Sequence, residues 1–416
     1  MRRPVLRRRA LAVALALLAL VTGCSVTDSG SRIGGAGPAI PGLPATPPMG
    51  WNSWNTFGCG ITEQIVRAQA DALVASGLRD RGYTYVVVDD CWMAPHRDDA
   101  GRLRADPVRF PSGMAALADY VHARGLRFGL YGGATDQTCA QFVGTYPGAA
   151  GSGGHERTDA TTFASWGVDF LKYDWCSLSN SHGQQVAAFT AMRDALRATG
   201  RPIVYSINPN SGVAGSVPGM VDDWGGVATM TRATNDITPA FTTDDGVFAY
   251  QGITNIADTV APLTGRVGRG AFVDPDMLVV GVGAVSPAMA RTQMSLWAMM
   301  AAPLIAGNDL TTMSAQTRAI LGAPAVLAID QDRSVRAGAP VDGNPAIWSR
   351  RTAPGVVVSL TNRTTTPQTL SVAVDDVGAA DATAAVDAWT GTRHPITDGR
   401  LTVTVAAHDT ALLSVR

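Results

Sequence analysis

The chain has 416 residues, of which 46% are hydrophobic, and its 33 basic and 34 acidic side chains leave a formal net charge of −1. This length predicts one large domain and a smaller one, with ample surface to bury, which argues against a disordered chain. The balanced charge provides no basic surface for phosphates and therefore does not indicate a nucleic-acid partner.

Residues 1–23 have the pattern of an export signal. Five arginines precede an apolar run from Ala10 to Val21, which is shorter than the roughly 20 residues of a membrane-spanning helix. The four residues ending at Cys24 resemble the bacterial lipobox, so we expect cleavage before Cys24 and lipid attachment to its sulfur. A free exported protein with a cysteine at its cleavage site is the alternative. Residues 24–46, rich in Gly, Pro, Ser and Ala, are expected to form a flexible tether. The protein is thus predicted to be extracytoplasmic, as a secreted protein or a cell-surface lipoprotein, and to meet a membrane through that lipid alone.

The other cysteines are consistent with export. Cys59, Cys91, Cys139 and Cys176 form an even set, as expected in a compartment where disulfides persist, and they allow three pairings. The sequence has no C-x-x-C motif and no Cys/His cluster with zinc-ligand spacing. We therefore predict disulfides and no metal site.

Short apolar runs alternate with helical patterns from Met49 to about Asp332, which is typical of a parallel sheet with helical crossovers. Thr62 is expected to cap a first helix, and Ser286 with the following proline to begin a late one. Eight such units predict a (β/α)8 TIM barrel over residues 47–333. The expected strands are Met49 to Trp54, Tyr83 to Asp89, Arg127 to Tyr131, Phe170 to Asp174, Ile203 to Ile207, Ala228 to Arg232, Ala271 to Val273 and Pro303 to Ala306.

Residues 334–416 have a different pattern, in which short strand-like runs are separated by turn residues. We expect a C-terminal antiparallel β-sandwich domain here. The expected strands are Ala346 to Ser349, Val356 to Thr361, Thr369 to Val374, Ala385 to Trp389, Leu401 to Val405 and Ala411 to Val415.

In a barrel of this kind the loops after the strands form the active face, and the fourth strand brings two charged groups there. Side chains alternate along a strand, so Lys172 and Asp174 share a face. If that face points inward, the ammonium is expected to lower the pKa of Asp174 and keep it ionised, as suits a nucleophile. Lys172 is the chain's only lysine. The alternative is a structural buried ion pair.

Asp236 follows the sixth strand and provides a second carboxylate. Glycoside hydrolysis needs one carboxylate that attacks the anomeric carbon and one that protonates the leaving oxygen. Taken alone, Asp236 fits a turn or a helix cap equally well. Asp89 and Asp90 fit sugar binding, cation binding or capping of a loop.

Four tryptophans near strand ends, Trp51, Trp54, Trp92 and Trp175, have flat faces that fit the C–H side of a sugar. Core packing is the alternative for each. The combination of such faces with carboxylates predicts a carbohydrate site.

Several ordered motifs resemble glycoside hydrolase family 27, the α-galactosidase and α-N-acetylgalactosaminidase family. The resemblance covers Pro47 to Asp332. It implies a cofactor-free retaining glycosidase built on a barrel followed by an antiparallel β-domain. The motifs are Pro48 to Trp54, Val88 to Trp92, Gly129 to Tyr131, Leu171 to Asp174, Arg232 to Asp236, Asp274 to Met277 and Ala328 to Asp332.

Carried over to this sequence, the resemblance implies that Asp174 is the nucleophile and Asp236 the general acid and base. It also implies the disulfides Cys59–Cys91 and Cys139–Cys176. The residues that it assigns to sugar binding are Trp54, Asp89, Asp90, Tyr131, Lys172, Arg232 and Asp276.

One segment departs from the family pattern. After the fifth strand the family usually has a Cys-Glu-Trp-like segment that reads the sugar's 2-position, whereas this chain has Tyr205 to Ser211, with Asn208 at the place of the carboxylate. The pair Asp89-Asp90 favours galactose. We therefore predict an exo-acting α-galactosidase acting on oligo- or polysaccharides. The alternatives are a β-L-arabinopyranosidase or α-N-acetylgalactosaminidase of the same family, or a non-catalytic sugar-binding lipoprotein.

Overall fold

The computed structural model describes residues 32–33, 40–41, 43–178, 181–209, 222–244 and 250–416. The expected export signal at 1–23, the lipid-attachment residue Cys24 and much of the tether lie outside these residues. Within them, no helix combines the length and the hydropathy needed to cross a membrane.

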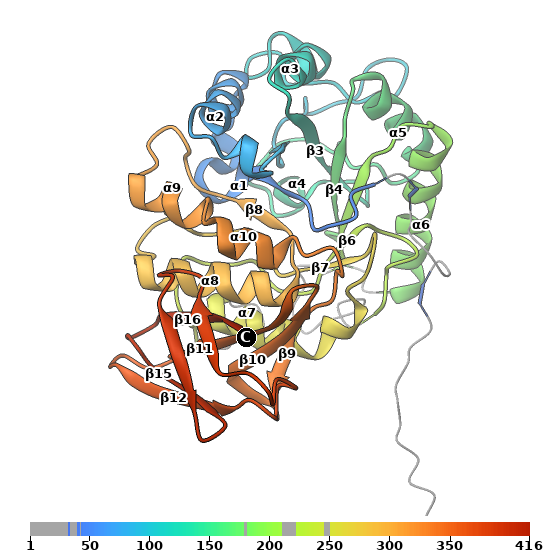
Figure 1. Ribbon diagram of the computed structural model, residues 1–416. Coiled ribbons are helices and arrows are strands. Elements are labelled where there is room, and N and C mark those ends of the chain that lie inside the picture. The colour runs from blue at the N-terminus through green and yellow to red at the C-terminus, as the bar shows by residue number, and fades with distance from the viewer. Residues whose placement is uncertain (1–31, 34–39, 42, 179–180, 210–221, 245–249) are drawn as a thin grey trace, which may run out of the picture. The chain divides into compact units, whose positions relative to one another are not determined.

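Eight parallel strands form the first sheet, in the order β7-β6-β5-β4-β3-β2-β1-β8 (Figure 1). A parallel bridge between Leu278 and Ala306 connects the segment after β7 to β8 and so closes the ring. The predicted barrel is confirmed. The strands are β1 Met49–Asn52, β2 Tyr85–Val88, β3 Arg127–Gly133, β4 Phe170–Asp174, β5 Val204–Asn208, β6 Met230–Arg232, β7 Phe272–Asp274 and β8 Leu304–Ala306.

Helices connect these strands, and two of them begin at caps predicted from the sequence. The Thr62 hydroxyl accepts a hydrogen bond from the Ile65 N–H at the start of α2, and Ser286 does the same for Met289 at the start of α8. The first strand ends two residues earlier than predicted because Trp54 begins a short helix. The helices are α1 Trp54–Phe57, α2 Glu63–Ala75, α3 Gly113–His122, α4 Cys139–Phe142, α5 Glu156–Ser165, α6 His182–Ala198, α7 Ile253–Val260, α8 Pro287–Met300, α9 Ala315–Leu321 and α10 Pro324–Asp330.

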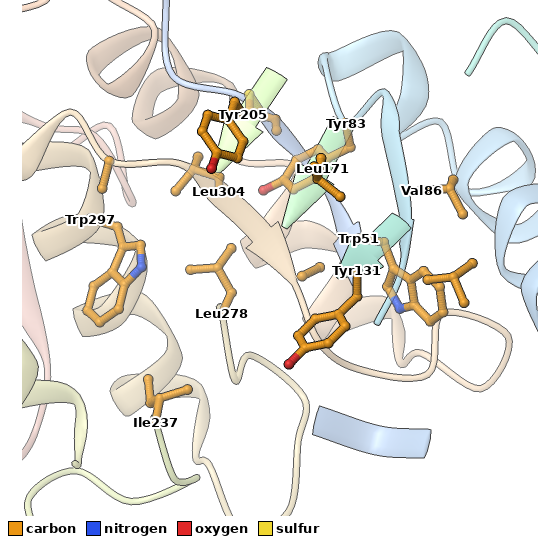
Figure 2. Packing of buried hydrophobic residues seen from close by; sticks show 14 of the residues in the cluster. Trp51, Tyr83, Val86, Tyr131, Leu171, Tyr205, Ile237, Leu278, Trp297 and Leu304 are labelled. Carbon is orange, nitrogen blue, oxygen red and sulfur yellow. The ribbon is translucent and has the colours of Figure 1, made fainter. Parts of the chain in front are cut away.

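Two clusters of large apolar side chains pack against the barrel strands. Phe170 shares a strand face with Lys172 and Asp174, and it packs with Tyr85, Val87, Val204, Met230 and Phe272. Trp51 and Leu304 belong to a second cluster, which also includes residues of the surrounding helices and is seen from close by in Figure 2. The Trp51 indole N–H donates to the carbonyl of Asn308, 2.8 Å away, and so ties β1 to the loop after β8. This dry core supports the strand ends that carry the predicted site.

The C-terminal domain has eight antiparallel strands in the order β12-β15-β14-β13-β16-β11-β10-β9. Leu370 and Leu401, from one end of this order, share a core with Val358 and Leu413 from the other, so the sheet folds over itself as a sandwich. The predicted sandwich is confirmed, although β9 and β14 were missed. The strands are β9 Ala339–Val341, β10 Asn344–Thr352, β11 Gly355–Thr361, β12 Gln368–Ala373, β13 Ala384–Asp387, β14 Arg393–Thr397, β15 Arg400–Val405 and β16 Thr410–Val415.

Buried polar contacts join the sandwich to the barrel. Arg350 on β10 is 1% exposed, and its guanidinium donates to the carbonyls of Ala298 at the end of α8 and Asp330 at the end of α10. Arg291 on α8 forms an ion pair with Asp409, next to β16. Arg350 thereby adds a donor to two carbonyls near helix ends, where intrahelical partners run out; the Ala298 carbonyl also accepts a hydrogen bond from the Ala301 N–H.

Candidate active site

The predicted residues meet at the carboxyl ends of the barrel strands. Asp174, the last residue of β4, pairs in register with Gly133 on β3 and Asn208 on β5. Two residues earlier on β4, Lys172 pairs in register with Tyr131 on β3. Parallel strands end at the same rim of a barrel, so these side chains share one face of the molecule.

Lys172 lies between two carboxylates. Its ammonium is 2.8 Å from Oδ2 of Asp89 and 3.7 Å from Oδ2 of Asp174, and it lies 5.1 Å from the centre of the Tyr131 ring. The Asn52 amide also donates to Asp89 Oδ2, at 2.6 Å. Asn52 was not singled out from the sequence, although it stands in the motif at the end of the first strand.

Asp174 is buried, and its other oxygen is free. The residue is 7% exposed, and no group in the described part of the chain hydrogen-bonds to its Oδ1. The pKa of Asp174 is raised to about 7, mainly by burial. The Asp89 carboxylate also raises this pKa, and the Lys172 ammonium opposes the shift. The expectation of a lowered pKa is therefore wrong, because desolvation outweighs the attraction of a lysine that lies closer to Asp89.

A second cation organises the opposite side of the site. Nη2 of Arg232 lies 2.5 Å from Oδ1 of Asp236 and 2.7 Å from Oδ2 of Asp276. Arg232 is buried, but the Asp236 side chain remains 57% exposed. Partial loss of solvent raises the pKa of the Asp236 carboxyl, yet the charges of Arg232 and Lys172 outweigh this and hold that pKa below its ordinary value.

Asp276 is fixed between Arg232 and the backbone. Its carboxylate accepts hydrogen bonds from the N–H groups of Ile237 and Met277, at 2.7 and 2.8 Å. Burial raises the pKa of Asp276 to about 6 despite the adjacent guanidinium. Its φ of +80° is uncommon for a residue with a side chain, and such backbone conformations cluster at functional sites.

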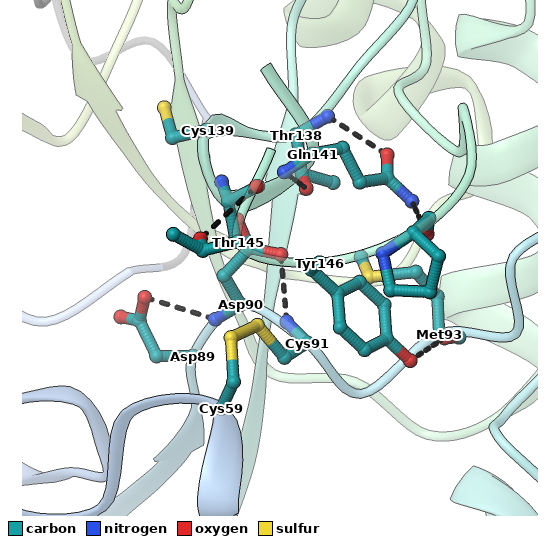
Figure 3. Close-up of a disulfide and its surroundings, with 12 residues drawn as sticks. Cys59, Asp89, Asp90, Cys91, Met93, Thr138, Cys139, Gln141, Thr145 and Tyr146 are labelled. Atoms are coloured by element: carbon teal, nitrogen blue, oxygen red, sulfur yellow. Dashed lines mark hydrogen bonds between the residues drawn. A yellow bond between two sulfur atoms is a disulfide. The ribbon is translucent and has the colours of Figure 1, made fainter. Parts of the chain in front are cut away.

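The neighbouring carboxylates Asp89 and Asp90 have different partners (Figure 3). Asp89 faces Lys172, whereas Asp90 accepts hydrogen bonds from the N–H groups of Cys91 and Ala140, at 2.6 and 2.9 Å. Burial raises the pKa of Asp90 to about 6, with these two hydrogen bonds opposing the shift. Asp90 therefore connects the loops that follow β2 and β3.

Two disulfides brace this side of the barrel, with the pairings that the resemblance implies. Cys59 bonds to Cys91, and Cys139 bonds to Cys176, two residues after Asp174. The Cys139 sulfur lies 4.0 Å from Oδ2 of Asp174. The loops around Asp174 are thus held by covalent links.

Three of the four tryptophans at strand ends belong to the core. Trp51, Trp92 and Trp175 are buried, and the Trp92 indole donates to the carbonyl of Tyr131. Trp54 is partly exposed, and the Asn52 side chain accepts a hydrogen bond from its N–H. Among these four, Trp54 alone keeps a face available to a ligand.

This arrangement suits a reaction that uses two carboxylates. Asp174 is buried and one of its oxygens has no hydrogen-bond partner among the described residues. Asp236 is exposed to solvent and forms an ion pair with the buried Arg232 guanidinium. Each carboxylate lies close enough to Lys172 to be influenced by its charge, and Asp236 in turn raises the pKa of Asp174. Among the described residues, no group of His, Cys, Asp and Glu side chains is arranged to hold a metal ion.

Comparisons with known proteins match both domains. A family model described as alpha galactosidase A matches residues 46–332, and one described as the alpha galactosidase C-terminal beta sandwich domain matches residues 342–415. The alpha-galactosidase A of Cellvibrio japonicus is 44% identical over 298 residues, which cover 69% of this chain and 68% of that protein.

Solved structures are similar over nearly the whole chain. Alpha-galactosidase I from Mortierella vinacea has a TM-score of 0.83 at 31% identity, covering 90% of this chain and 98% of that one. An alpha-galactosidase from Saccharomyces cerevisiae, solved with raffinose, has a TM-score of 0.79 at 29% identity, covering 92% of this chain and all of that one.

Proposed function

The chain belongs to glycoside hydrolase family 27, the α-galactosidase family, and from this membership we propose that Asp174 and Asp236 carry out its reaction. The enzyme is a glycoside hydrolase that removes terminal α-D-galactosyl residues from oligo- or polysaccharides. One observation supports the assignment of residues above all others: the buried Asp174 keeps an oxygen without a partner, whereas Asp236 is exposed on Arg232.

The first step forms a covalent glycosyl-enzyme. Asp174 Oδ1 attacks the anomeric carbon, the bond to the leaving oxygen breaks, and Asp236 gives its proton to that oxygen. Oδ1 fits this role because Lys172 interacts with the other carboxylate oxygen, Oδ2, and Oδ1 has no hydrogen-bond partner among the described residues. The step therefore needs an ionised Asp174 and a protonated Asp236.

In the second step water replaces the enzyme on the sugar. Asp236, now ionised, takes a proton from the water while the water oxygen attacks the anomeric carbon and the bond to Asp174 breaks. Two inversions restore the α configuration. The exposure of Asp236 gives solvent water a route to it.

Other rim residues are proposed to bind the galactosyl group. Lys172, Asp89 and Asp276 supply fixed charges for its hydroxyls, and Trp54 and Tyr131 line its apolar side. We propose that the remaining rim residues Asp90 and Arg232 also bind hydroxyls, directly or by positioning their neighbours.

Azide rescue tests the two roles by the configuration of the product. In an Asp174→Gly variant, azide enters the space left by the carboxylate and attacks nitrophenyl α-galactoside directly, so we expect β-galactosyl azide. In Asp236→Gly, azide attacks the glycosyl-enzyme from the other side, so we expect α-galactosyl azide. Asp80→Gly, at an exposed helical site, is the control. An Asp174 variant with full activity, or rescue products of the opposite configuration, would refute the assignment.

Asn208 is proposed to read the 2-position of the sugar. It ends β5 beside Asp174, and the backbone carbonyl of Asn208 accepts a hydrogen bond from the Trp175 N–H, at 3.1 Å. A panel of nitrophenyl α-galactoside, α-N-acetylgalactosaminide and β-L-arabinopyranoside tests this proposal. We expect the α-galactoside to be hydrolysed fastest, and Asn208→Ala to reduce that preference.

Export of the enzyme to the cell surface is proposed from the N-terminal pattern and supported by the two disulfides, which persist in oxidising compartments. The proposal includes removal of residues 1–23 and lipidation of Cys24. Mass spectrometry of the mature N-terminus tests it: we expect a lipid-modified Cys24, and a free N-terminus elsewhere would contradict the anchor.

A further inference from the structure

A polar groove of about 460 Å³ opens on the same face of the barrel, between the loops that follow β1, β8 and the segment after β7. Amide and hydroxyl side chains dominate the described part of its wall, together with the backbone of two glycines and the side chains of Val282 and Met313. The wall also includes the carboxylate of Asp309, which already accepts hydrogen bonds from Gln69, Thr311 and Thr312. Among the residues that line it are Asn55, Thr56, Gly281, Asn308, Thr312 and Ser314.

Two loops carry both the groove and the proposed active site. Asn52 contacts Asp89 in the site, and Asn55 lines the groove. A chain spans at most about 3.6 Å per residue, so their Cα atoms lie within about 11 Å of each other. By the same limit, Gly281 in the groove lies within about 18 Å of Asp276. The groove therefore lies close enough for one oligosaccharide to occupy both places.

Asn308 provides an unused hydrogen-bond acceptor in this wall. The residue is 2% exposed, and among the described residues nothing donates to its Oδ1. Its backbone carbonyl is held by the Trp51 indole, so the position is rigid. Buried polar atoms in native proteins normally have a partner, so an Oδ1 without one in a residue that lines the groove is unusual and marks this part of the wall.

We propose that this groove binds a neutral sugar unit of the substrate, on the leaving-group side of the galactosyl residue. The inference rests on the proposed exo-acting α-galactosidase activity. In an exo-acting enzyme the terminal galactose fills the site, and the remainder of the substrate continues only from the leaving oxygen. A second sugar bound beside the site is therefore part of the leaving group. Amides and hydroxyls suit the polar edges of such a sugar, and Val282 and Met313 suit its C–H faces.

Filling the groove tests the proposal. Met313→Trp places a bulky ring in the groove, whereas Gln316→Trp places the same ring on an exposed position of α9 that does not line it. We expect Met313→Trp to lower kcat/KM for raffinose about tenfold while nitrophenyl α-galactoside changes less than about twofold, because the aryl group is too short to need the groove. The control should alter neither substrate.

Thr312→Ala is a milder second variant, since its side chain is exposed. It should raise KM for raffinose a few-fold and leave kcat for nitrophenyl galactoside unchanged. The groove proposal is overturned if Met313→Trp affects neither substrate, or both equally, while Thr312→Ala has no selective effect. A wild-type enzyme that does not hydrolyse nitrophenyl galactoside would instead refute the proposed function itself.

Discussion

The two sides of the proposed active site use the same components in opposite ways. On one side the Lys172 ammonium lies between Asp89 and Asp174, and on the other the Arg232 guanidinium lies between Asp236 and Asp276. Asp174 is buried and its pKa rises, whereas Asp236 is largely exposed and its pKa falls.

The difference shows that a neighbouring cation alone does not decide the protonation state of a carboxyl group. Lys172 is 3.7 Å from Asp174, whereas Arg232 is 2.5 Å from Asp236. Asp174 is therefore the carboxyl with both the more distant cation and the deeper burial. The raised pKa of Asp174 and the lowered pKa of Asp236 favour Asp174 as the site of the last proton of the pair in the free enzyme, whereas the reaction requires that proton on Asp236.

The largest expected effect comes from removing either carboxylate. Asp174→Asn should lower kcat/KM for both raffinose and nitrophenyl α-galactoside by more than about 10⁴-fold, because attack is lost whatever the leaving group. Asp236→Asn should lower kcat/KM roughly 10²–10⁴-fold for raffinose but less than about tenfold for the nitrophenyl substrate, which needs little help from a proton. Equal losses in the two variants on both substrates would remove the distinction between the two sides.

The pH dependence should invert between the wild type and Asp236→Asn. Wild-type kcat/KM is expected to fall above about pH 7, where the pair loses its last proton. In Asp236→Asn only the ionisation of Asp174 remains, so kcat/KM for nitrophenyl α-galactoside should rise roughly 30- to 50-fold from pH 5 to pH 7. Its midpoint should lie slightly below that of the wild-type limb, because the negative charge of Asp236 is gone. Parallel profiles would contradict the assigned proton positions.

The covalent bracing of the Asp174 side can be tested by removing one disulfide. The double variant Cys139→Ser and Cys176→Ser should lose about 2–4 kcal/mol of unfolding free energy, measured by chemical denaturation. It should also lower kcat more than the double variant Cys59→Ser and Cys91→Ser, because Cys139 lies beside Asp174. Equal kcat values in the two double variants would show that the bracing is purely structural.

The smallest effect tests whether burial also raises a carboxyl pKa away from the site. Asp330 is fully buried, and this raises its pKa from 3.8 to about 7 although Arg350 opposes the shift. An acid with a raised folded pKa adds stability that is complete below the unfolded pKa, near 4, and is lost as pH rises through 7.

Asp330→Asn should therefore reduce the fall in Tm between pH 5 and pH 8 by about 2 °C, with unchanged kcat for nitrophenyl α-galactoside. Thermal melts at the two pH values measure it. An unchanged difference in Tm would show that Asp330 is ionised throughout this range.

Sequence patterns located the carboxylates of the site but not their environments. Alternation along β4 placed Lys172 and Asp174 on one face, and the expected strand had the same bounds as the observed one. The direction of the Asp174 pKa depends on solvent exclusion and on a third group, Asp89, that approaches from another strand. The alternation of residues along one strand carries no information about solvent exclusion or about the approach of Asp89.

The missed elements have physical reasons too. β9 has three residues, one of them Pro340, and β14 alternates only between exposed and half-buried positions. Neither has the apolar alternation by which strands are recognised. Asn52 was missed for another reason: its partner Asp89 directly follows the next strand, β2, and no spacing along the chain links the two residues.

Arg350 has a consequence for attempts to miniaturise this catalyst. Its guanidinium, reaching from the sandwich, is the partner of carbonyls at Ala298 and Asp330 on the barrel helices. Truncation after Asp332 would remove this donor from both carbonyls and leave Ala298 only its hydrogen bond from the Ala301 N–H. It would also expose the apolar side chains that pack against Trp348, Val357 and Leu412. A shorter enzyme would need other residues to pack against α8 and α10, because the sandwich is not a separable domain.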